Sequence, residues 1–208
     1  MEFISEIRDF PELTFEEKQH QYWLDGMQIP SVSEIMKPLS AAQYQEVDQE
    51  VLNKAAHRGT AVHTAIETYV KFGMVDIEPE YEGYFKAFQR WEQDTRPVAI
   101  GSECRVYHKL FRYAGTADLP LKFRNKRVLV DVKTSATVNK MLTGVQLEAY
   151  SMAFDSQFIH FDGKAILHLQ KDGNYQWVYY NRDDLESRET FGALLQIYHH
   201  IQKYRKDS

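Results

Sequence analysis

The 208-residue sequence predicts a mixed α/β fold in which helices flank a central mixed sheet. Two observations support this fold class. The first half of the chain carries helical patterns, with Val62, Ile66 and Val70 recurring on one face. The second half alternates strand-forming runs with two further helices, in the order β-β-β-α-β-β-α. This length suits a single hydrophobic core.

The N-terminal half combines short strands with helices. Residues 13–29 fit a hairpin, because Asp25-Gly26 is a typical two-residue turn. Residues 43–57 predict a polar helix, and residues 59–72 predict a separate amphipathic helix. A third helix is expected over residues 81–94, and its aromatic stripe is more typical of a core than of a surface that stacks bases.

The C-terminal half is expected to hold the sheet. The run VLVDV is apolar on both sides of its acid, as expected for an interior strand. The predicted elements are a meander over 98–108, 111–121 and 127–134, a helix over 140–154, a hairpin over 165–170 and 175–180, and a closing helix over 182–205. We expect residues 1–95 to form an N-terminal hairpin and helical region, residues 96–208 to form the core, and both to make one compact domain.

Composition excludes several classes of protein. Cys104 is the only cysteine, which rules out an internal disulfide and a four-cysteine iron–sulfur cluster. No apolar run approaches the roughly 20 residues that span a bilayer. The N-terminus, MEFISEIRDF, lacks the features of a secretory signal or a transit peptide. These features predict a cytoplasmic protein without a membrane partner.

Charge is distributed unevenly along the chain, although the net value is only −5. Residues 1–100 contain 18 Asp and Glu against 9 Lys and Arg. From Arg105 to Lys140 there are nine Lys and Arg, and the only two acids are Asp118 and Asp131. Two carboxylates in a basic segment suit a metal site that faces a polyanion. A solvated basic hairpin face explains the same count equally well.

An acid-x-lysine pattern lies at the centre of this segment. Asp131 and Lys133 are two apart on one predicted strand, so their side chains share a face, and Asp118 is expected on the neighbouring strand. Hard divalent cations prefer carboxylate and carbonyl oxygens, which Asp118, Asp131 and the Val132 carbonyl would supply. Taken alone, the pattern is more often an exposed ion pair.

The surrounding motifs add a family resemblance. GTAD, DVKTS and QLEAY, preceded by RGTAVHTAIE and YWLDGMQIPSVSEIM, resemble the RecB-like branch of the PD-(D/E)XK nuclease superfamily. Within that branch the order is similar to phage exonucleases and to the mitochondrial genome maintenance exonuclease. The resemblance implies a restriction-endonuclease-like core, a mixed central sheet flanked by helices, with a helical N-terminal half.

The resemblance also implies roles for individual residues. Asp118 and Asp131 match the metal-binding acids, Lys133 matches the catalytic lysine, and His63 matches a histidine ligand on the preceding helix. The alternative, non-functional interpretation of His63 is a core or surface histidine. Glu103 matches an acid on the first core strand near a second metal. Glu67 could orient His63, hold a second metal through water, or form a salt bridge. The residues matched to substrate binding are Gln146, Tyr150, Thr134, Ser135 and Arg58.

The implied function is a Mg²⁺- or Mn²⁺-dependent DNA exonuclease without an iron–sulfur cluster. It would digest single-stranded DNA from free ends, in phage-type recombination, repair or replication. A single-strand-binding or recombination protein is a candidate partner. Two alternatives stay open: a structure-specific endonuclease on the same core, and a nuclease-fold DNA-binding module that does not cut. No G-x-x-x-x-G-K-[ST] motif occurs, so any motor would be a separate protein.

Overall fold

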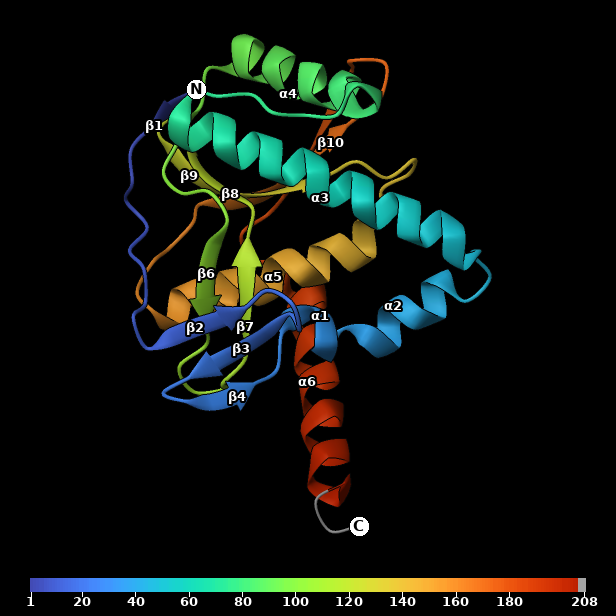
Figure 1. Ribbon diagram of the computed structural model, residues 1–208. Helices are drawn as coiled ribbons and strands as arrows, with labels where there is room; N and C mark the ends of the chain where they lie inside the picture. The colour runs from blue at the N-terminus through green and yellow to red at the C-terminus, as the bar shows by residue number, and fades with distance from the viewer. Residues whose placement is uncertain (206–208) are drawn as a thin grey trace.

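A computed structural model describes residues 1–205, and it shows a mixed central sheet with helices on both faces (Figure 1). The sheet has six strands in the order β1-β5-β8-β9-β10-β11. Strands β9 and β10 run parallel and are joined through helix α5, whereas β8–β9 and β10–β11 are antiparallel hairpins. The strands are β1 (Glu2–Phe3), β5 (Val98–Ala99), β8 (Leu119–Phe123), β9 (Lys126–Lys133), β10 (Gly163–Leu169) and β11 (Tyr175–Tyr180).

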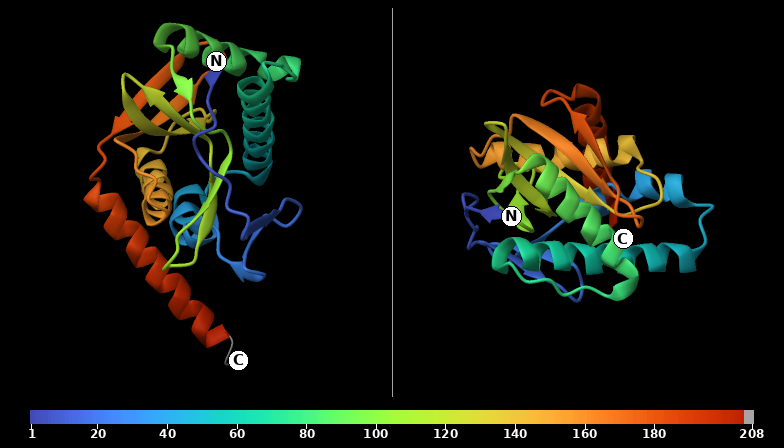
Figure 2. Two further views of the ribbon diagram at one scale, coloured as in Figure 1. Left: turned by 90° about the vertical axis from the view of Figure 1, so that its left-hand side faces the viewer. Right: turned by 90° about the horizontal axis from the view of Figure 1, so that it is seen from above.

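Two small sheets extend the fold on one side of the central sheet (Figure 2). The first has the order β2-β3-β4 and comes from the predicted hairpin region, and the second is the hairpin β6–β7. Tyr22 Oη and Thr116 Oγ1 lie 2.8 Å apart and link the two. Their strands are β2 (Leu13–Glu16), β3 (Gln21–Leu24), β4 (Met27–Ile29), β6 (Cys104–Tyr107) and β7 (Ala114–Ala117).

Helices cover the central sheet in two layers, each with its own hydrophobic cluster. Helices α3 and α4 bury Val62, Ile66, Phe88 and Trp91 against one face. On the other face α5 and α6 pack with α1 and the small sheets, with Phe154 at the centre. The helices are α1 (Val32–Ile35), α2 (Lys37–Tyr44), α3 (Gln49–Phe72), the 3-10 turn η1 (Pro79–Tyr81), α4 (Glu82–Thr95), α5 (Lys140–Ser156) and α6 (Leu185–Arg205).

Helix α3 replaces two predicted helices, so that part of the prediction is wrong. The helix runs unbroken through Gly59, whose position is open, and a glycine there costs only about 1 kcal/mol. Asp48 caps its start by accepting a hydrogen bond from the Glu50 amide at 2.7 Å. Gly73 ends it in the left-handed region, with φ of 69°.

The predicted meander is also wrong in part. The run 98–108 divides into β5 and β6, and the run 111–121 divides into β7 and β8, with the two halves of each in different sheets. The β8–β9 hairpin agrees with the prediction. Asp118 is therefore the single residue between β7 and β8, where the chain crosses from one sheet to the other. Among the described helices, none combines the length and the apolar character that a membrane span requires.

Candidate active site and metal centre

The β8–β9 hairpin brings the two predicted acids together. Leu119 pairs with Val130, so Asp118 and Asp131 lie at the adjoining position of the ladder. Asp118 Oδ2 accepts a hydrogen bond from the Val132 amide at 2.7 Å, which fixes that carboxylate at the end of β9. The acids therefore approach each other from β9 and from the residue just before β8, so the neighbouring-strand position predicted for Asp118 is wrong by one residue while the predicted proximity of the two acids holds.

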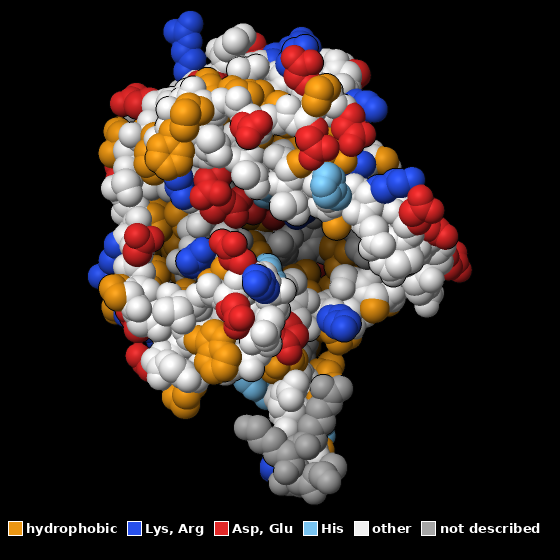
Figure 3. Space-filling model, viewed as in Figure 1, with side chains coloured by type: hydrophobic (Ala, Val, Ile, Leu, Met, Phe, Trp, Pro, Cys, Tyr) orange, Lys and Arg blue, Asp and Glu red, His pale blue; other side chains and the backbone are white. Residues whose placement is uncertain are grey.

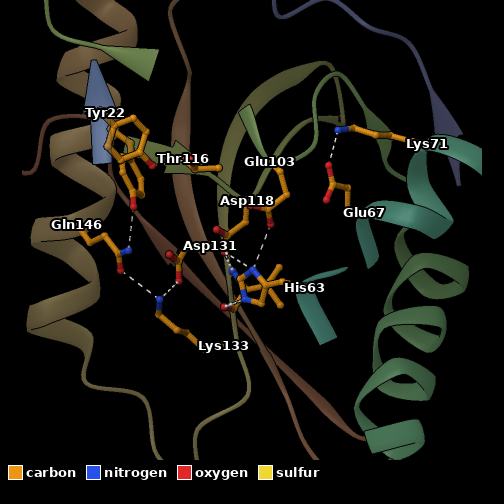
Figure 4. Close-up of polar contacts among 12 residues, drawn as sticks. Tyr22, His63, Glu67, Lys71, Glu103, Thr116, Asp118, Asp131, Lys133 and Gln146 are labelled. Atoms are coloured by element: carbon orange, nitrogen blue, oxygen red, sulfur yellow. Dashed lines mark hydrogen bonds and ion pairs between the residues drawn. The ribbon is translucent and has the colours of Figure 1, made fainter. Parts of the chain in front are cut away.

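Helix α3 places His63 against these strands (Figure 4). Its Nδ1 lies 3.3 Å from Glu103 Oε1 and 3.7 Å from Asp118 Oδ2. Its Nε2 lies 3.0 Å from the carbonyl oxygen of Val132. All of these neighbours are acceptors, so a ring that donates to both sides carries a proton on each nitrogen. An imidazolium thus occupies the space between two carboxylates and a carbonyl.

The pKa shifts follow from this crowding of acids. Burial lowers the pKa of His63, but the Asp118 and Glu103 carboxylates outweigh burial and raise it to about 9. Burial raises the pKa of Asp131 to about 6, opposed by Lys133 and reinforced by Asp118. Burial likewise raises the pKa of Asp118, opposed by His63. Both carboxylates are therefore costly to ionise even with His63 and Lys133 beside them, and an added divalent cation would reduce that cost.

Lys133 is held between a carboxylate and an amide. Its Nζ lies 2.7 Å from Asp131 Oδ2 and donates to Gln146 Oε1 at 3.1 Å. Gln146 Nε2 in turn donates to the Tyr150 hydroxyl at 3.1 Å. Tyr150 is buried, and a Cβ on Gly115 would lie 2.5 Å from its ring, so glycine is required there. Gln146 and Tyr150 thus brace the lysine in this structure.

Glu103 reaches the site from a bend, which corrects the strand placement predicted for it. It precedes β6, has a left-handed φ of 50°, and its amide donates to the Asp118 carbonyl at 2.8 Å. Such a φ is uncommon outside glycine and places the side chain toward His63. The sequence offered no signal of this bend, because Glu103 continues an apparently extended run.

Glu67 shares a face of α3 with His63 but turns toward a different partner. Its Oε1 lies 2.5 Å from Lys71 Nζ, one helical turn away. Of the roles that the sequence left open, this geometry matches the salt bridge. Figure 4 shows the pair set apart from the His63 contacts.

The residues predicted to bind substrate are gathered where β9 ends. Arg58 Nε donates to Thr134 Oγ1 at 3.3 Å, and its guanidinium lies 5.5 Å from the centre of the Tyr84 ring. Ser135 Oγ donates to the Thr137 carbonyl at 2.7 Å, which shapes the turn after β9. Arg58 and Thr134 are 76 residues apart, so only the fold connects them.

His168 and Tyr84 adjoin the site although sequence reasoning did not select them. His168 is buried on β10 in register with Lys133, and its Nε2 donates to the Ser135 carbonyl at 2.7 Å. A polar residue inside the apolar run Ala165–Gln170 was the available signal. Tyr84 belongs to a stripe interpreted as core, and it is indeed buried while supporting Arg58.

The charge count left open a basic field around the two acids and a solvated hairpin face, and several cations of the basic segment are directed away from the acids. Lys122 and Arg127 pair with Glu6, and Arg105 lies over the Phe15 ring. The turn at Arg124 lies at the far end of β9 from Asp131. Lys133 is the member of this set that contacts an acid of the site.

The donor set fits a hard divalent cation. One ligand atom each from His63, Glu103 and Asp118 lies within 4.8 Å of the others, and the Val132 carbonyl faces the same ring. Asp131 is 2% exposed, yet among the described residues neither oxygen accepts a hydrogen bond of regular geometry, although Oδ2 lies near Lys133. The Asp131 carboxylate, whose Oδ1 has no hydrogen-bond partner among the described residues, could add a further ligand.

The site opens to the surface beside α3. A cavity of about 350 Å³ is lined by His63, Thr64, Glu67 and Glu103. Figure 3 shows a hollow on this face of the molecule, below α3, with acidic and basic side chains at its rim. Two of the candidate ligands, His63 and Glu103, therefore line a cavity that opens to solvent.

Comparison with known proteins gives likenesses in structure alone. No protein-family model matches the sequence, and no curated protein does. The crystal structure of SSO0001 is similar at 13% identity and a TM-score of 0.44, covering 80% of this chain and 74% of that chain. An alkaline exonuclease from Laribacter hongkongensis is similar at 14% identity, with a TM-score of 0.39 over 70% of this chain and 81% of that chain. The structure of that exonuclease in complex with dAMP has a TM-score of 0.40 at 14% identity, and the match covers 86% of this chain and 92% of that chain.

Proposed function

We propose that this protein is a divalent-metal-dependent nuclease that hydrolyses phosphodiester bonds of DNA on a PD-(D/E)XK-type core. The observation that carries the proposal is the cluster of His63, Glu103 and Asp118 with the Lys133–Asp131 pair directly beside it. Groups from α3, from the bend before β6 and from the β8–β9 hairpin meet in one place, where His63 and Glu103 line a cavity. An exposed ion pair would need none of these convergent groups.

The chain's own residues have distinct roles in this proposal. His63, Glu103, Asp118, Asp131 and the Val132 carbonyl would hold Mg²⁺ or Mn²⁺. A bound divalent ion lowers the pKa of water and neutralises charge that develops on the phosphate. Lys133 would place an ammonium beside the scissile phosphate or the attacking water, and Gln146 keeps that ammonium oriented. Arg58, Thr134 and Ser135 would contact the phosphate backbone.

His63 must lose a proton to act as a ligand. In this structure both ring nitrogens are directed at acceptors, as a protonated imidazolium requires. Metal binding therefore releases a proton from this ring. The same carboxylates stabilise either cation, which supports a site built for positive charge.

The decisive test measures cleavage of end-labelled DNA with Mg²⁺ or Mn²⁺. Wild type is expected to cut, and Asp131→Asn and Lys133→Ala are expected to lose cleavage. Lys122→Ala is the matched control, since it removes a lysine that pairs with Glu6 away from the site. An inert wild type, or full activity of both site variants, would refute the catalytic assignment and favour a non-cutting DNA-binding module.

Metal binding separates the roles of the two site residues. Calorimetric titration with Mn²⁺ should show weaker binding for Asp131→Ala and near-normal binding for Lys133→Ala, because only the carboxylate is a ligand. Equal affinities for the two variants would contradict this division.

We further propose an exonuclease that starts at free ends of single-stranded DNA. The support is the sequence resemblance, together with the position of α2 and the start of α3 beside the site (Figure 1). A linear single strand should be digested much faster than a closed single-stranded circle. Equal rates would instead favour the endonuclease. The resemblance alone supports a place in phage-type recombination, repair or replication with a single-strand-binding or recombination partner, in the cytoplasm of a bacterium or infected host.

A further inference from the structure

A second and larger cavity lies next to the candidate active site. Its volume is about 700 Å³, within the roughly 300–1,000 Å³ range of small-ligand pockets. It is bounded by the end of α2, the first turns of α3, Tyr84 of α4 and the turn over residues 135–139. It shares none of its lining residues with the cavity over His63 and Glu103.

The wall nearest the active site is continuous with the catalytic strand. Ser135 lines the cavity, and only Thr134 separates it from Lys133. The buried His168 holds the Ser135 carbonyl at 2.7 Å, so the start of this turn is tied to β10. A strand whose phosphate lies at Lys133 would therefore have its neighbouring nucleotide beside this cavity.

The side chain of Arg58 lies between this cavity and the candidate active site. Arg58 lines the cavity, donates to Thr134 and lies over the Tyr84 ring. Among residues 1–205 it forms no ion pair with a carboxylate. An arginine that is positioned but not neutralised is suited to a phosphate.

The rest of the lining combines apolar side chains with Gln43, Lys54, Thr137 and Asn139. Val47, Val51, Leu52 and Ala55 from α2–α3 face Val138 across the opening. The side chain of Val51 is 57% exposed, although most large apolar residues of the N-terminal helices are buried. Apolar side chains beside an arginine suit a nucleotide, which has an apolar base face and an anionic phosphate.

We infer that this cavity binds the base of one unpaired nucleotide of the substrate strand, next to the scissile phosphate. The inference rests on the proposed nuclease function and adds a subsite that requires a single strand. In a duplex, both faces of each base are covered by neighbouring bases, so a paired nucleotide cannot offer a face to these walls. Arg58 holds the phosphate of that nucleotide, and Val51, Ala55 and Val138 contact its base.

The test measures binding without cleavage, in EDTA, by fluorescence anisotropy. The probes are labelled single-stranded oligothymidylates in which an abasic tetrahydrofuran replaces one thymidine, moved stepwise from the end. The abasic unit keeps every phosphate, so only the missing base changes affinity. Wild type should bind the probe that is abasic at one particular position about tenfold more weakly than the intact probe, and the other probes nearly normally.

Two adjacent alanines of α3 supply a matched pair of variants. Ala55→Trp fills the cavity and should abolish the difference between the intact and the abasic probe. Ala56→Trp places the same side chain on an exposed neighbouring position outside the cavity and should preserve the difference. Circular dichroism and thermal melting check that both variants fold, since neither position is fully buried.

Several results would overturn the inference. These are equal binding of all abasic probes by wild type, no binding of the intact probe, equally tight binding of a blunt duplex, or an unchanged position-specific difference in Ala55→Trp. Failure of the proposed function is separate, because it appears as absent cleavage in Mg²⁺ or Mn²⁺. A protein that cuts but shows no position-specific loss disproves the subsite alone.

Discussion

Two buried groups of charged side chains differ in how many partners their buried acid has. Glu148 of α5 is fully buried, and both of its oxygens are used: Oε2 by Lys164 of β10 and Oε1 by Arg188 of α6, whose Nε donates at 2.8 Å. Asp131 is 2% exposed, and its Oδ2 lies 2.7 Å from Lys133 Nζ, whereas its Oδ1 has no hydrogen-bond partner among the described residues. One buried acid has a partner at each oxygen, and the other has a partner at one oxygen only.

The difference separates a structural network from a candidate functional one. Lys164 also donates to the Arg182 carbonyl at 3.1 Å, so the Glu148 network joins α5, β10 and the segment before α6. Buried polar groups are nearly always satisfied in native proteins, and exceptions call for an explanation. At Asp131 we propose that the explanation is a bound cation, which would complete the site. The predictions below test this contrast, beginning with the largest expected effect.

Replacing Asp131 should destroy activity while improving the fold. Asp131→Asn is expected to lower cleavage at least about a thousandfold, because it removes a ligand and the acid that pairs with Lys133. In EDTA its free energy of unfolding should rise by about 1–3 kcal/mol, since burial raises the pKa of this acid to about 6 and its ionised form is unfavourable at neutral pH. Urea unfolding and a cleavage assay check the two parts. Lower stability would contradict the contrast.

Replacing Glu148 should have the reverse outcome. Glu148→Gln leaves the Lys164 ammonium buried without its carboxylate, and the free energy of unfolding should fall by about 3–5 kcal/mol. The double variant Glu148→Gln with Lys164→Met should recover much of this loss, because no buried charge remains. Cleavage per folded molecule, measured at low temperature, should stay close to wild type. A specific loss of cleavage in a stable variant would show that this network belongs to the site.

The pH dependence of the free energy of unfolding should reveal the protonation of the His63 ring. Its pKa is about 9 in the folded protein against an ordinary 6.5, so the folded state keeps a proton that the unfolded state loses. Its contribution is complete below pH 6.5 and is lost as the pH rises through 9. In EDTA the free energy of unfolding should therefore fall by about 2 kcal/mol over this range.

Urea unfolding between pH 6.5 and 9 measures this dependence, and His63→Gln is the control. The variant retains a polar side chain but cannot titrate, so most of the slope should disappear. A wild-type stability that stays level or rises across this range would show that His63 is not held between the carboxylates.

Much of the fold followed from sequence periodicity, and the errors have physical causes. The β8–β9 and β10–β11 hairpins and α5 were predictable from alternation and helical spacing. The break of one helix at Gly59 was wrong because packing of α3 on the sheet outweighs the modest cost of an internal glycine. The crossing at Asp118 was hidden because residues on both sides of it continue the same strand-like pattern.

The candidate site was predictable in its membership more than in its geometry. Spacing placed Asp131 and Lys133 on one face, and the family resemblance supplied His63 from α3. The backbone bend that directs Glu103 toward His63 depends on a positive φ at Glu103, and the residue types around it do not predict that φ. The contact between Arg58 and Thr134, and the support from His168, arise from tertiary packing between distant segments.

The smallest expected effect concerns a third charged pair, Glu67–Lys71. It lies close to His63 in sequence and on the same face of α3, but both of its side chains are about one-third exposed and they bind each other. Glu67→Gln should therefore change cleavage by less than about threefold and stability by less than about 0.5 kcal/mol, as is usual for an i,i+4 pair in contact with solvent. The matched control is Glu50→Gln, which removes the same kind of pair from the first turn of α3. If Glu67→Gln lowered cleavage or Mn²⁺ affinity tenfold while Glu50→Gln did not, Glu67 would belong with the candidate metal ligands, and Lys71 would be a partner that it gives up when metal binds.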